Sequence, residues 1–358
     1  MDFSGAQITK AGESLRKFSK LERAEKDRVL EVLAFFRLCH ERPLDNAVKL
    51  LKETVLPIDR TAIFGKRLKR YVSIYRKLVR FETMTLRNMH DIGGCRAIVT
   101  TEKKLWQVVR ALRRAKEFRS STGVIRKKDY VTTPKDDGYR SYHLIGTFDG
   151  AGDVSRNIEV QIRTRIQHYW ATALEIVDLF TGQTLKSNSG FPEWKVFFRE
   201  VGLQFSIIDS IHMIDSIPAS SKRSEFLKKL ALVKDGRESL QRLQQLSKRL
   251  KVIEKLEGYA NSIEIVNKQL ELGQKRGYVL ITIDPAQKIV NTKHFSEQEN
   301  ELANVEYLTA EKHAAKSGQS VVALVSSAAM GGIKESYPNY FADSTEFLKR
   351  LFFLESIA

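Results

Sequence analysis

Strand-like and helix-like segments alternate through the middle of this sequence, between residues 95 and 180. Short runs rich in apolar residues, of the length of a strand, are separated by longer segments in which apolar residues recur at helical spacing. Such alternation is typical of a sheet covered by helices, so we predict a mixed α+β domain of ordinary size. The predicted strands are 95–100, 142–148 and 158–163, and the predicted helices are 103–118 and 165–180.

Helical patterns flank this alternating region on both sides. Segments 21–41 and 44–51 precede it, and the long segments 195–215 and 223–272 follow it. The two long segments are rich in Leu, Ile, Lys and Glu. Apolar residues at near-heptad spacing in 240–256 predict that these helices pack as a hairpin.

The pattern changes after Gly277. Two short strand-like runs are joined by an Asp284-Pro285 turn, and a third strand and a terminal helix follow them. We therefore place a domain boundary near residues 273–277. The predicted elements beyond it are strands 278–283, 289–292 and 320–325 and helix 344–354.

Charge is distributed unevenly along the chain. The 358 residues include 60 Lys and Arg against 43 Asp and Glu, which gives a formal net charge of +17 and a pI near 9.7. Residues 278–358 hold 7 basic and 10 acidic residues, so their net charge is −3 and that of the preceding part is +20. Such an excess indicates a polyanionic partner, and the acidic C-terminal part suits a segment that covers a basic surface.

Composition also excludes several classes of protein. With 42% hydrophobic residues the chain is globular rather than disordered, and its length is enough for two or three domains. No apolar run approaches the length of a membrane span, and the first residues lack the apolar core of a secretory signal. Cys39 and Cys95, the two cysteines, cannot build a disulfide framework or an all-cysteine zinc site. We therefore expect a cytoplasmic protein with no membrane partner.

Four polar clusters stand out, and the first of them, from Arg67 to Lys77, reads RLKRYVSIYRK. If a helix begins near Tyr71, Ser73 and Lys77 lie one turn apart on the same helical face. Arg67 and Lys69 would then approach from the preceding segment. Cations, a hydroxyl and helical N–H groups suit a polyphosphate, although a solvated basic face also explains these residues.

The second cluster, DIGGCR, runs from Asp91 to Arg96. It places an acid before two glycines at the start of a predicted strand. Carboxylates at strand ends commonly hold Mg²⁺ beside phosphates. Taken alone, however, an aspartate in an ordinary turn is the simpler interpretation.

The third cluster begins at Asp129 and ends with the segment PKDDGYRSYH. An Asp137-Gly138 turn precedes an extended stretch in which Tyr139 and His143 would share one face. A tyrosine beside Arg and His offers a stacking platform for a base. A tyrosine packed at the edge of a sheet is the equally good alternative.

The fourth cluster, EVQIRT, starts at Glu159. Strand alternation sends its Val and Ile side chains to the core and leaves Glu159, Gln161 and Arg163 together on the other face. This combination indicates a site, and a charged solvated face is the alternative.

Together and in this order, the four clusters resemble the synthetase domain of the RelA/SpoT family. The family's patterns are R-x-K-x-x-x-S-I-x-x-K, D-I-x-G-x-R, D-Y-x-x-x-P-K-x-x-G-Y-x-S-x-H and E-V-Q-I-R-T, and all four occur here between Arg67 and Thr164. The resemblance implies a nucleotidyltransferase-like mixed sheet flanked by helices. It also implies a pyrophosphokinase that transfers pyrophosphate from ATP to a ribose 3′-hydroxyl and releases AMP.

The resemblance further implies a role for each matching residue. Arg67 and Arg96 would sandwich the adenine of ATP, and Asp91 and Glu159 would hold Mg²⁺, with Glu159 also near the attacking hydroxyl. Tyr139 would stack on the base of the acceptor. The other implied roles are phosphate binding for Lys69, Ser73 and Lys77, and acceptor binding for Lys135, His143, Gln161 and Arg163.

Two departures from the family pattern concern the acceptor. The chain reads YRSYHL where alarmone synthetases usually have Leu before the His. The segment RIQHYWATALEIVD follows EVQIRT in place of the usual M-H-x-x-A-E continuation. Both departures argue against GDP or GTP as the acceptor.

The C-terminal part carries a second resemblance. Tyr337 and Tyr340 form a Y-x-x-Y sequence in a small β/α region that has no cysteine, although two aromatics around a turn proline are also ordinary core residues. The order of synthetase, helical linker and this region resembles CapRel, a group of fused toxin–antitoxin proteins within the toxic small alarmone synthetases. The resemblance implies a toxin domain with N-terminal helices (1–185), a helical linker (186–273) and an antitoxin and phage-sensing pseudo-zinc-finger domain (274–358).

This second resemblance implies a function in anti-phage defence. The C-terminal domain would block the ATP site through Tyr337 and Tyr340 until a phage capsid protein, or another phage protein, releases it. The enzyme would then pyrophosphorylate the 3′-CCA end of tRNA and stop translation. A (p)ppGpp or (p)ppApp alarmone synthetase is the alternative, and a non-catalytic RNA-binding regulator is a third hypothesis. The basic residues available to guide a tRNA are Arg110, Arg113, Arg114, Lys116, Arg119, Arg126, Lys127 and Lys128.

Overall fold

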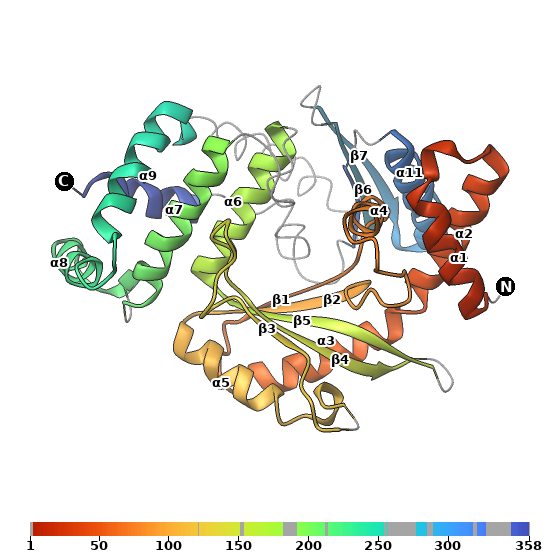
Figure 1. The fold of residues 1–358 in the computed structure, drawn as a ribbon, viewed down its shortest axis with the longest axis horizontal. Helices are drawn as coiled ribbons and strands as arrows, with labels where there is room; N and C mark the ends of the chain where they lie inside the picture. The colour runs from red at the N-terminus through yellow and green to blue at the C-terminus, as the bar shows by residue number, and fades with distance from the viewer. Residues whose placement is uncertain are drawn as a thin grey trace.

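A computed structural model shows two sheets and several groups of helices (Figure 1). The larger sheet lies at the centre with helices on both of its faces, so the predicted α+β fold, a mixed sheet flanked by helices, is confirmed. The structure describes residues 3–120, 122–150, 154–181, 192–211, 214–253, 256, 277–284, 289–317, 321–326 and 345–357.

The central sheet has five strands in the order β1-β2-β5-β4-β3. β2 (Gly93–Val99) and β5 (Ser155–Thr164) are parallel neighbours, whereas all other neighbouring strands are antiparallel. The parallel pair brings the segments before β2 and within β5 to the same part of the sheet. The remaining strands are β1 (Ile63–Leu68), β3 (Lys127–Asp129) and β4 (Tyr142–Asp149).

Two helices cover one face of this sheet. α3 (Glu41–Val55) packs against β2, β4 and β5, and α5 (Glu102–Leu112) packs against β5 (Figure 1). The core between them is built from alternate strand positions, including the fully buried Val160 and Ile162. The side chains at the intervening positions point to the opposite face, which carries the polar clusters.

A second core holds three helices at one end of the sheet. α1 (Gly5–Arg16), α2 (Arg23–Leu38) and α4 (Tyr71–Arg80) pack around the fully buried Ile74 and Leu78. α4 begins three residues after β1 ends, so its first turn lies beside the sheet. The predicted start of this helix near Tyr71 is confirmed.

The largest core among the described residues belongs to a helical bundle, which lies at the opposite end of the sheet from α1, α2 and α4 (Figure 1). The last helix of the chain is part of this bundle, because Phe347 contacts Phe198 and Phe205. None of the helices in the described part of the chain is both long and apolar enough to cross a membrane. The bundle consists of α6 (Arg165–Thr181), α7 (Pro192–Asp209), α8 (Ala219–Leu230), α9 (Gly236–Leu250) and α14 (Thr345–Glu355).

The C-terminal part contains a small antiparallel sheet of order β7-β6-β8. α11 (Asn300–Ser317) packs on this sheet and also contacts α4, so the small sheet and α11 lie beside the N-terminal helices (Figure 1). We call these elements the C-terminal unit. α14 is attached elsewhere, to the helical bundle. The strands are β6 (Gly277–Asp284), β7 (Ile289–Ser296) and β8 (Val321–Ser326), and short 3₁₀ helices occupy Phe18–Lys20, Lys116–Phe118, Ile214–Ser216 and Glu297–Glu299.

Two helix predictions were wrong. The predicted helix 223–272 is divided in its first part, because Asp235 adopts a left-handed conformation and Gly236 starts α9. An Asp-Gly pair is a known turn signal and marked this break in the sequence. The predicted helix 103–118 ends at Leu112, where α5 gives way to a turn. Residues 273–276 of the predicted domain boundary lie outside the described residues.

The packing of α14 gives a test of its place in the bundle core. Leu351 is 0% exposed and Phe352 is 47% exposed, although the two residues are adjacent. Leu351→Ala should therefore lower the free energy of unfolding by about 2–5 kcal/mol, because it leaves a cavity in the core. Phe352→Ala should lower it by less than about 0.5 kcal/mol. Urea denaturation of both variants measures this; equal losses would contradict the placement of α14.

Candidate active site

The polar clusters meet on the face of the central sheet that α3 and α5 leave uncovered. The strand register places Glu159 of β5 beside Gly94 of β2. Two residues further along β5, Gln161 lies between Arg96 of β2 and His143 of β4. Directly opposed residues of neighbouring strands point to the same face, so three strands contribute to one polar surface.

Asp91 precedes β2 and joins lysines from two other segments. Lys69 Nζ donates to Asp91 Oδ2 at 2.7 Å, and Lys77 Nζ donates to Asp91 Oδ1 at 2.8 Å. Lys69 follows β1 and Lys77 lies on α4, one turn after Ser73. Both oxygens of one carboxylate therefore tie three segments of the chain together.

The charges in this cluster do not balance. Burial alone would raise the pKa of Asp91, but Lys69 and Lys77 outweigh it and the pKa lies below its ordinary value. Burial lowers the pKa of Lys69, and the positive charges of Lys77 and Arg67 add to this effect against the opposing influence of Asp91. An anion bound here would relieve the repulsion among these cations.

Two arginines extend the positive surface across β1 and β2. Arg67 lies opposite Gly94, and Arg96 lies opposite Gly65, so both side chains project from the same face. The Arg96 side chain passes over Gly65, because a Cβ added there would be 3.1 Å from Arg96 Nε. Burial, together with the charges of Arg163 and Arg67, lowers the pKa of Arg96 to about 9. The guanidinium therefore stays charged at neutral pH.

The second carboxylate, Glu159, is held by hydrogen bonds at both oxygens. His143 Nδ1 lies 3.2 Å from Glu159 Oε1, and Gln161 Nε2 donates to Glu159 Oε2 at 2.6 Å. Arg163 in turn donates to Gln161 Oε1 at 2.9 Å. Burial alone would raise the pKa of Glu159, but His143, Gln161 and the charge of Lys69 outweigh it and the pKa lies well below its ordinary value. Glu159 is therefore ionised at neutral pH.

The two carboxylates lie near the same end of β2, since Asp91 comes two residues before this strand and Glu159 is paired with its second residue, Gly94. Among the described residues, no three His, Cys, Asp or Glu side chains are close enough to form a complete metal site. Mg²⁺ usually takes only one or two carboxylates from the protein and completes its shell with phosphates and water. Asp91 and Glu159 fit that donor set.

Aromatic side chains surround the predicted acceptor residues. The Tyr139 hydroxyl lies 2.9 Å from His143 Nε2, so Tyr139, His143 and Glu159 form a continuous hydrogen-bonded chain. Lys135 Nζ lies 4.7 Å from the ring centroids of both Tyr139 and Tyr130. Tyr130, the tyrosine of the D-Y-x-x-x-P-K pattern, contacts Tyr139 and His143.

Helix α7 supports the turn that carries Tyr139, a contact that no local sequence pattern indicated. Gly138, with φ of +89°, lies against α7, and a Cβ added to it would be 2.9 Å from Phe198 O. A Cβ added to Gly202 of α7 would be 2.7 Å from Gly138 O. Trp170 completes the support, because its Nε1 donates to Phe198 O at 2.8 Å and its ring contacts Tyr139.

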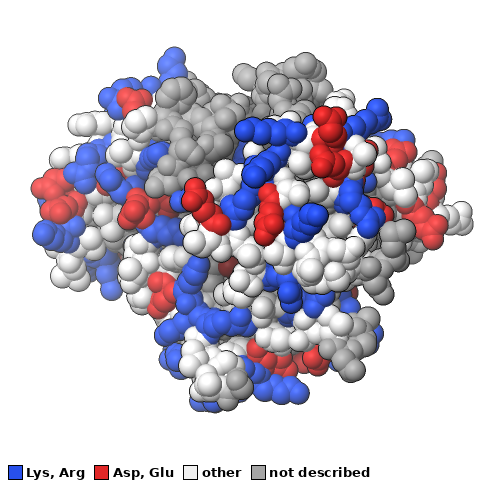
Figure 2. All heavy atoms as spheres, turned by 45° about the vertical axis from the view of Figure 1, so that its right-hand side comes forward, with Lys and Arg blue, Asp and Glu red and all other residues white. Residues whose placement is uncertain are grey.

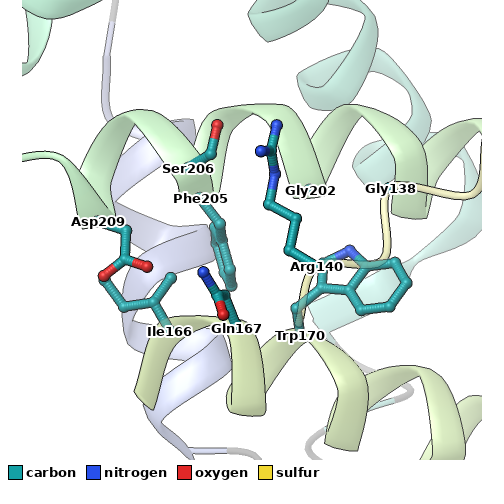
Figure 3. A pocket seen from close by; sticks show the side chains of 9 residues that line it. All are labelled: Gly138, Arg140, Ile166, Gln167, Trp170, Gly202, Phe205, Ser206 and Asp209. Carbon is teal, nitrogen blue, oxygen red and sulfur yellow. The ribbon is translucent and has the colours of Figure 1, made fainter. Parts of the chain in front are cut away.

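A small cavity lies behind this turn, between α6 and α7 (Figure 3). Asp209 lies on its wall and accepts a hydrogen bond from Thr164 Oγ1 at 2.5 Å. Burial raises the pKa of Asp209 to about 7, although the hydrogen bond from Thr164 opposes the shift. Asp209 therefore belongs to the packing behind the polar face. The lining residues are Gly138, Arg140, Ile166, Gln167, Trp170, Gly202, Phe205, Ser206 and Asp209.

The structure thus brings the residues of the four clusters to one face of the sheet and the adjoining first turns of α4. The two tyrosines of the Y-x-x-Y sequence, Tyr337 and Tyr340, lie outside the described residues, and their predicted role stays a prediction.

Comparison with known proteins points to the same stretch of chain. Residues 66–176 match the family model described as a region found in RelA / SpoT proteins. GTP pyrophosphokinase YwaC of Bacillus subtilis is 32% identical over 126 residues, which are 32% of this chain and 56% of YwaC. GTP pyrophosphokinase YjbM of the same organism is 32% identical over 90 residues, which are 24% of this chain and 41% of YjbM. The chain thus spans about half the length of these curated relatives.

Solved structures also align with about half of this chain. The small alarmone synthetase 1 from Bacillus subtilis bound to its product pppGpp aligns with a TM-score of 0.39 and 25% identity, over 47% of this chain and 89% of that one. A GTP pyrophosphokinase family protein from Streptococcus pneumoniae aligns with a TM-score of 0.39 and 24% identity, over 52% and 94% of the chains. The family model and the curated relatives support a synthetase domain of the RelA/SpoT type in this chain.

The contact between Gly138 and Gly202 predicts an unusual effect of alanine. In a helix interior, alanine is normally about 0.5–1 kcal/mol more favourable than glycine. Gly202→Ala should nevertheless lower the free energy of unfolding by about 1–3 kcal/mol, because its methyl group would collide with backbone atoms. Gly5→Ala is the matched control, since a Cβ there meets only the movable end of the Arg87 side chain. A stabilising Gly202→Ala substitution in urea denaturation would show that the turn does not rest on α7.

Proposed function

We propose that this chain is an ATP-dependent pyrophosphokinase of the RelA/SpoT type whose acceptor is the 3′-hydroxyl at the CCA end of tRNA. The observation that carries the proposal is that Glu159 is paired with Gly94, three residues after Asp91, and that Lys69 and Lys77 of the first cluster bond to Asp91. A surplus of positive charge with two ionised carboxylates suits a triphosphate with its metal ion. Mg²⁺ held by Asp91 and Glu159 would neutralise charge on the phosphates when it is bound.

In the proposed reaction, the 3′-oxygen of the acceptor attacks the β-phosphorus of ATP. The bond from this phosphorus to the oxygen that bridges to the α-phosphate breaks, and AMP leaves. Glu159 accepts the proton of the attacking hydroxyl, since it is ionised at neutral pH. Lys69 and Lys77 stabilise the negative charge on the transferred group, and the arginine pair Arg67 and Arg96 contacts the adenine.

The hydrogen-bonded chain from Tyr139 through His143 fixes the position of Glu159 for this step. A base positioned in advance lowers the barrier because less reorganisation is needed during the reaction. Tyr139 also supplies an aromatic surface for the base of the acceptor, with Lys135, Gln161 and Arg163 around it.

Two features favour tRNA as the acceptor. The part of the chain before residue 278 has a net charge of +20, which suits a polyanion much larger than a nucleotide. Lys and Arg side chains are frequent across the face of the molecule drawn in Figure 2. Of the basic residues predicted to guide a tRNA, Arg126 is half-buried, and the exposed ones are Arg110, Arg113, Arg114, Lys116, Arg119, Lys127 and Lys128.

An alarmone synthetase is the second candidate. The observation that favours it is that the curated relatives YwaC and YjbM are GTP pyrophosphokinases. Such an enzyme would transfer the same group to a guanosine or adenosine nucleotide. The two candidates therefore differ in the acceptor and share the donor site.

Transfer of label from ATP distinguishes these candidates. ATP labelled in the β-phosphate is incubated with deacylated tRNA, GDP, GTP or AMP, and we expect the label at the 3′ end of tRNA. Glu159→Gln should reduce the transfer at least about 10²-fold, because the base is lost. tRNA whose 3′ end has been oxidised with periodate lacks the 3′-hydroxyl and serves as the control, which should take up no label. Label in a guanosine or adenosine nucleotide would instead establish the alarmone synthetase. No transfer to any acceptor, either by the wild-type chain or by Tyr337→Ala/Tyr340→Ala, which lacks the proposed block, would contradict both.

We further propose that the chain resembles CapRel in its regulation. In this hypothesis Tyr337 and Tyr340 block the adenine site by stacking on Arg67 and Arg96, and a phage capsid protein that binds the C-terminal part relieves the block. The hypothesis is supported by where the chain is held on either side of the two tyrosines. Strand β8, which ends at Ser326, belongs to the C-terminal unit, whereas α14, which begins at Thr345, packs on the helical bundle. The two tyrosines lie between these attachments in the sequence.

Loss of the two tyrosines should make the protein toxic without a trigger. We expect expression of Tyr337→Ala/Tyr340→Ala to stop growth, because the donor site is then permanently accessible. The same substitutions combined with Glu159→Gln should be harmless, which assigns the toxicity to catalysis. Normal growth of cells with a well-expressed double variant would contradict the block.

A further inference from the structure

A buried group of charged and aromatic side chains joins α11 of the C-terminal unit to α2 and α4. Arg37 Nη1 donates to Glu311 Oε2 at 3.1 Å, and Arg37 Nη2 donates to the Tyr307 hydroxyl at 3.3 Å. The other oxygen of Glu311 accepts a hydrogen bond from the backbone N–H of Tyr71 at 3.2 Å. The Arg37 guanidinium lies over the Tyr71 ring, 4.4 Å from its centroid. One carboxylate from α11 therefore contacts both N-terminal helices at once.

The ion pair is withdrawn from solvent, since the side chains of Arg37 and Glu311 are 4% and 3% exposed. Burial alone would lower the pKa of Arg37, but Glu311 outweighs it and the net shift is upward. The pair is therefore charged, and each partner compensates the other. If Glu311 alone is neutralised, Arg37 keeps an unpaired charge in the interior, which is far more costly than the loss of an exposed ion pair.

The position of the bond to Tyr71 gives this group its functional meaning. Tyr71 is the first residue of α4, and Glu311 satisfies one of the N–H groups that a helix leaves without an internal partner. A carboxylate also interacts favourably with the positive end of the helix dipole. α4 carries Lys77, which is bonded to Asp91, and Ser73 lies one turn before it. Glu311 is linked to the polar face through α4, since its hydrogen bonds are with Arg37 and with the first residue of this helix.

We propose that Glu311, together with Arg37, is a positioning residue for ATP, so that the C-terminal unit forms part of the donor site by fixing α4. This inference rests on the proposed pyrophosphokinase function. Glu311 fixes the axis and the start of α4, and thereby the distance of Lys77 from Asp91. When the ion pair is broken, α4 shifts and ATP binds more weakly, while the chemical step in the bound complex changes much less.

Equilibrium binding of a non-hydrolysable ATP analogue to the full chain tests the proposal. For Glu311→Gln we expect an increase in Kd of about tenfold, since glutamine keeps a hydrogen-bond acceptor for Tyr71 but leaves Arg37 unpaired. Steady-state kinetics should show a similar rise in the KM for ATP with kcat changed less than about threefold. Glu306→Gln on the same helix is the matched control, because Glu306 pairs only with the exposed Lys293.

A double substitution separates positioning from a general loss of structure. Arg37→Met/Glu311→Met removes both charges, so no unpaired charge remains in the interior, but it also removes the carboxylate that accepts a hydrogen bond from the backbone N–H of Tyr71. We expect its thermal unfolding to lie at or above that of Glu311→Gln, while its Kd for the analogue stays about tenfold above the wild-type value. Wild-type-like binding by the folded double variant would contradict the proposal, also if Glu311→Gln itself does not fold.

The outcomes distinguish this proposal from the proposed function. Binding of the analogue by Glu311→Gln with the wild-type Kd would overturn the positioning role and leave the pyrophosphokinase untouched. No binding of the analogue by Tyr337→Ala/Tyr340→Ala, in which the proposed block is absent, would instead contradict the donor site itself. Equal effects of Glu311→Gln and Glu306→Gln would show a non-specific loss of stability and would also overturn the proposal.

Discussion

The hydrogen bonds of Asp91 with Lys69 and Lys77 are the interaction on which the candidate active site depends. They join helix α4 to the segment after β1 and the segment before β2, which a backbone hydrogen bond from Lys69 N to Ile92 O at 2.7 Å also connects. Without the carboxylate, the cations of the first cluster would repel one another in a partly buried place. Asp91 therefore holds the lysines of the proposed donor site close together. It compensates only part of their positive charge, and the remaining charge attracts an anion.

Much of this site could be predicted because strand alternation and helical spacing are local rules. Glu159, Gln161 and Arg163 had to share a face once 158–163 was a strand, and the hydrogen bonds among them follow from that alternation. Ser73 and Lys77 had to lie one turn apart once a helix began at Tyr71. Spacing also predicted the closeness of Tyr139 and His143, which a 2.9 Å contact joins.

The contacts that position these residues could not be predicted, because they join distant parts of the chain without a local pattern. Arg37 and Glu311 are 274 residues apart, and nothing near either one marks it as the partner of the other. Helix α11 itself was missed, since its apolar residues do not form a clear stripe. The contact of Gly138 with Gly202 depends on two elements meeting at backbone distance, which neither glycine reveals alone.

The two proposed roles of the C-terminal part place a constraint on any trigger. If Glu311 fixes α4 for ATP, then ATP binding and the docking of the C-terminal unit must favour one another by the same factor. A trigger that pulled the whole unit away would expose the donor site but would also leave Arg37 unpaired and α4 unfixed. Release of an active enzyme therefore requires a movement that frees the adenine site from Tyr337 and Tyr340 while Glu311 stays bonded to Arg37 and Tyr71.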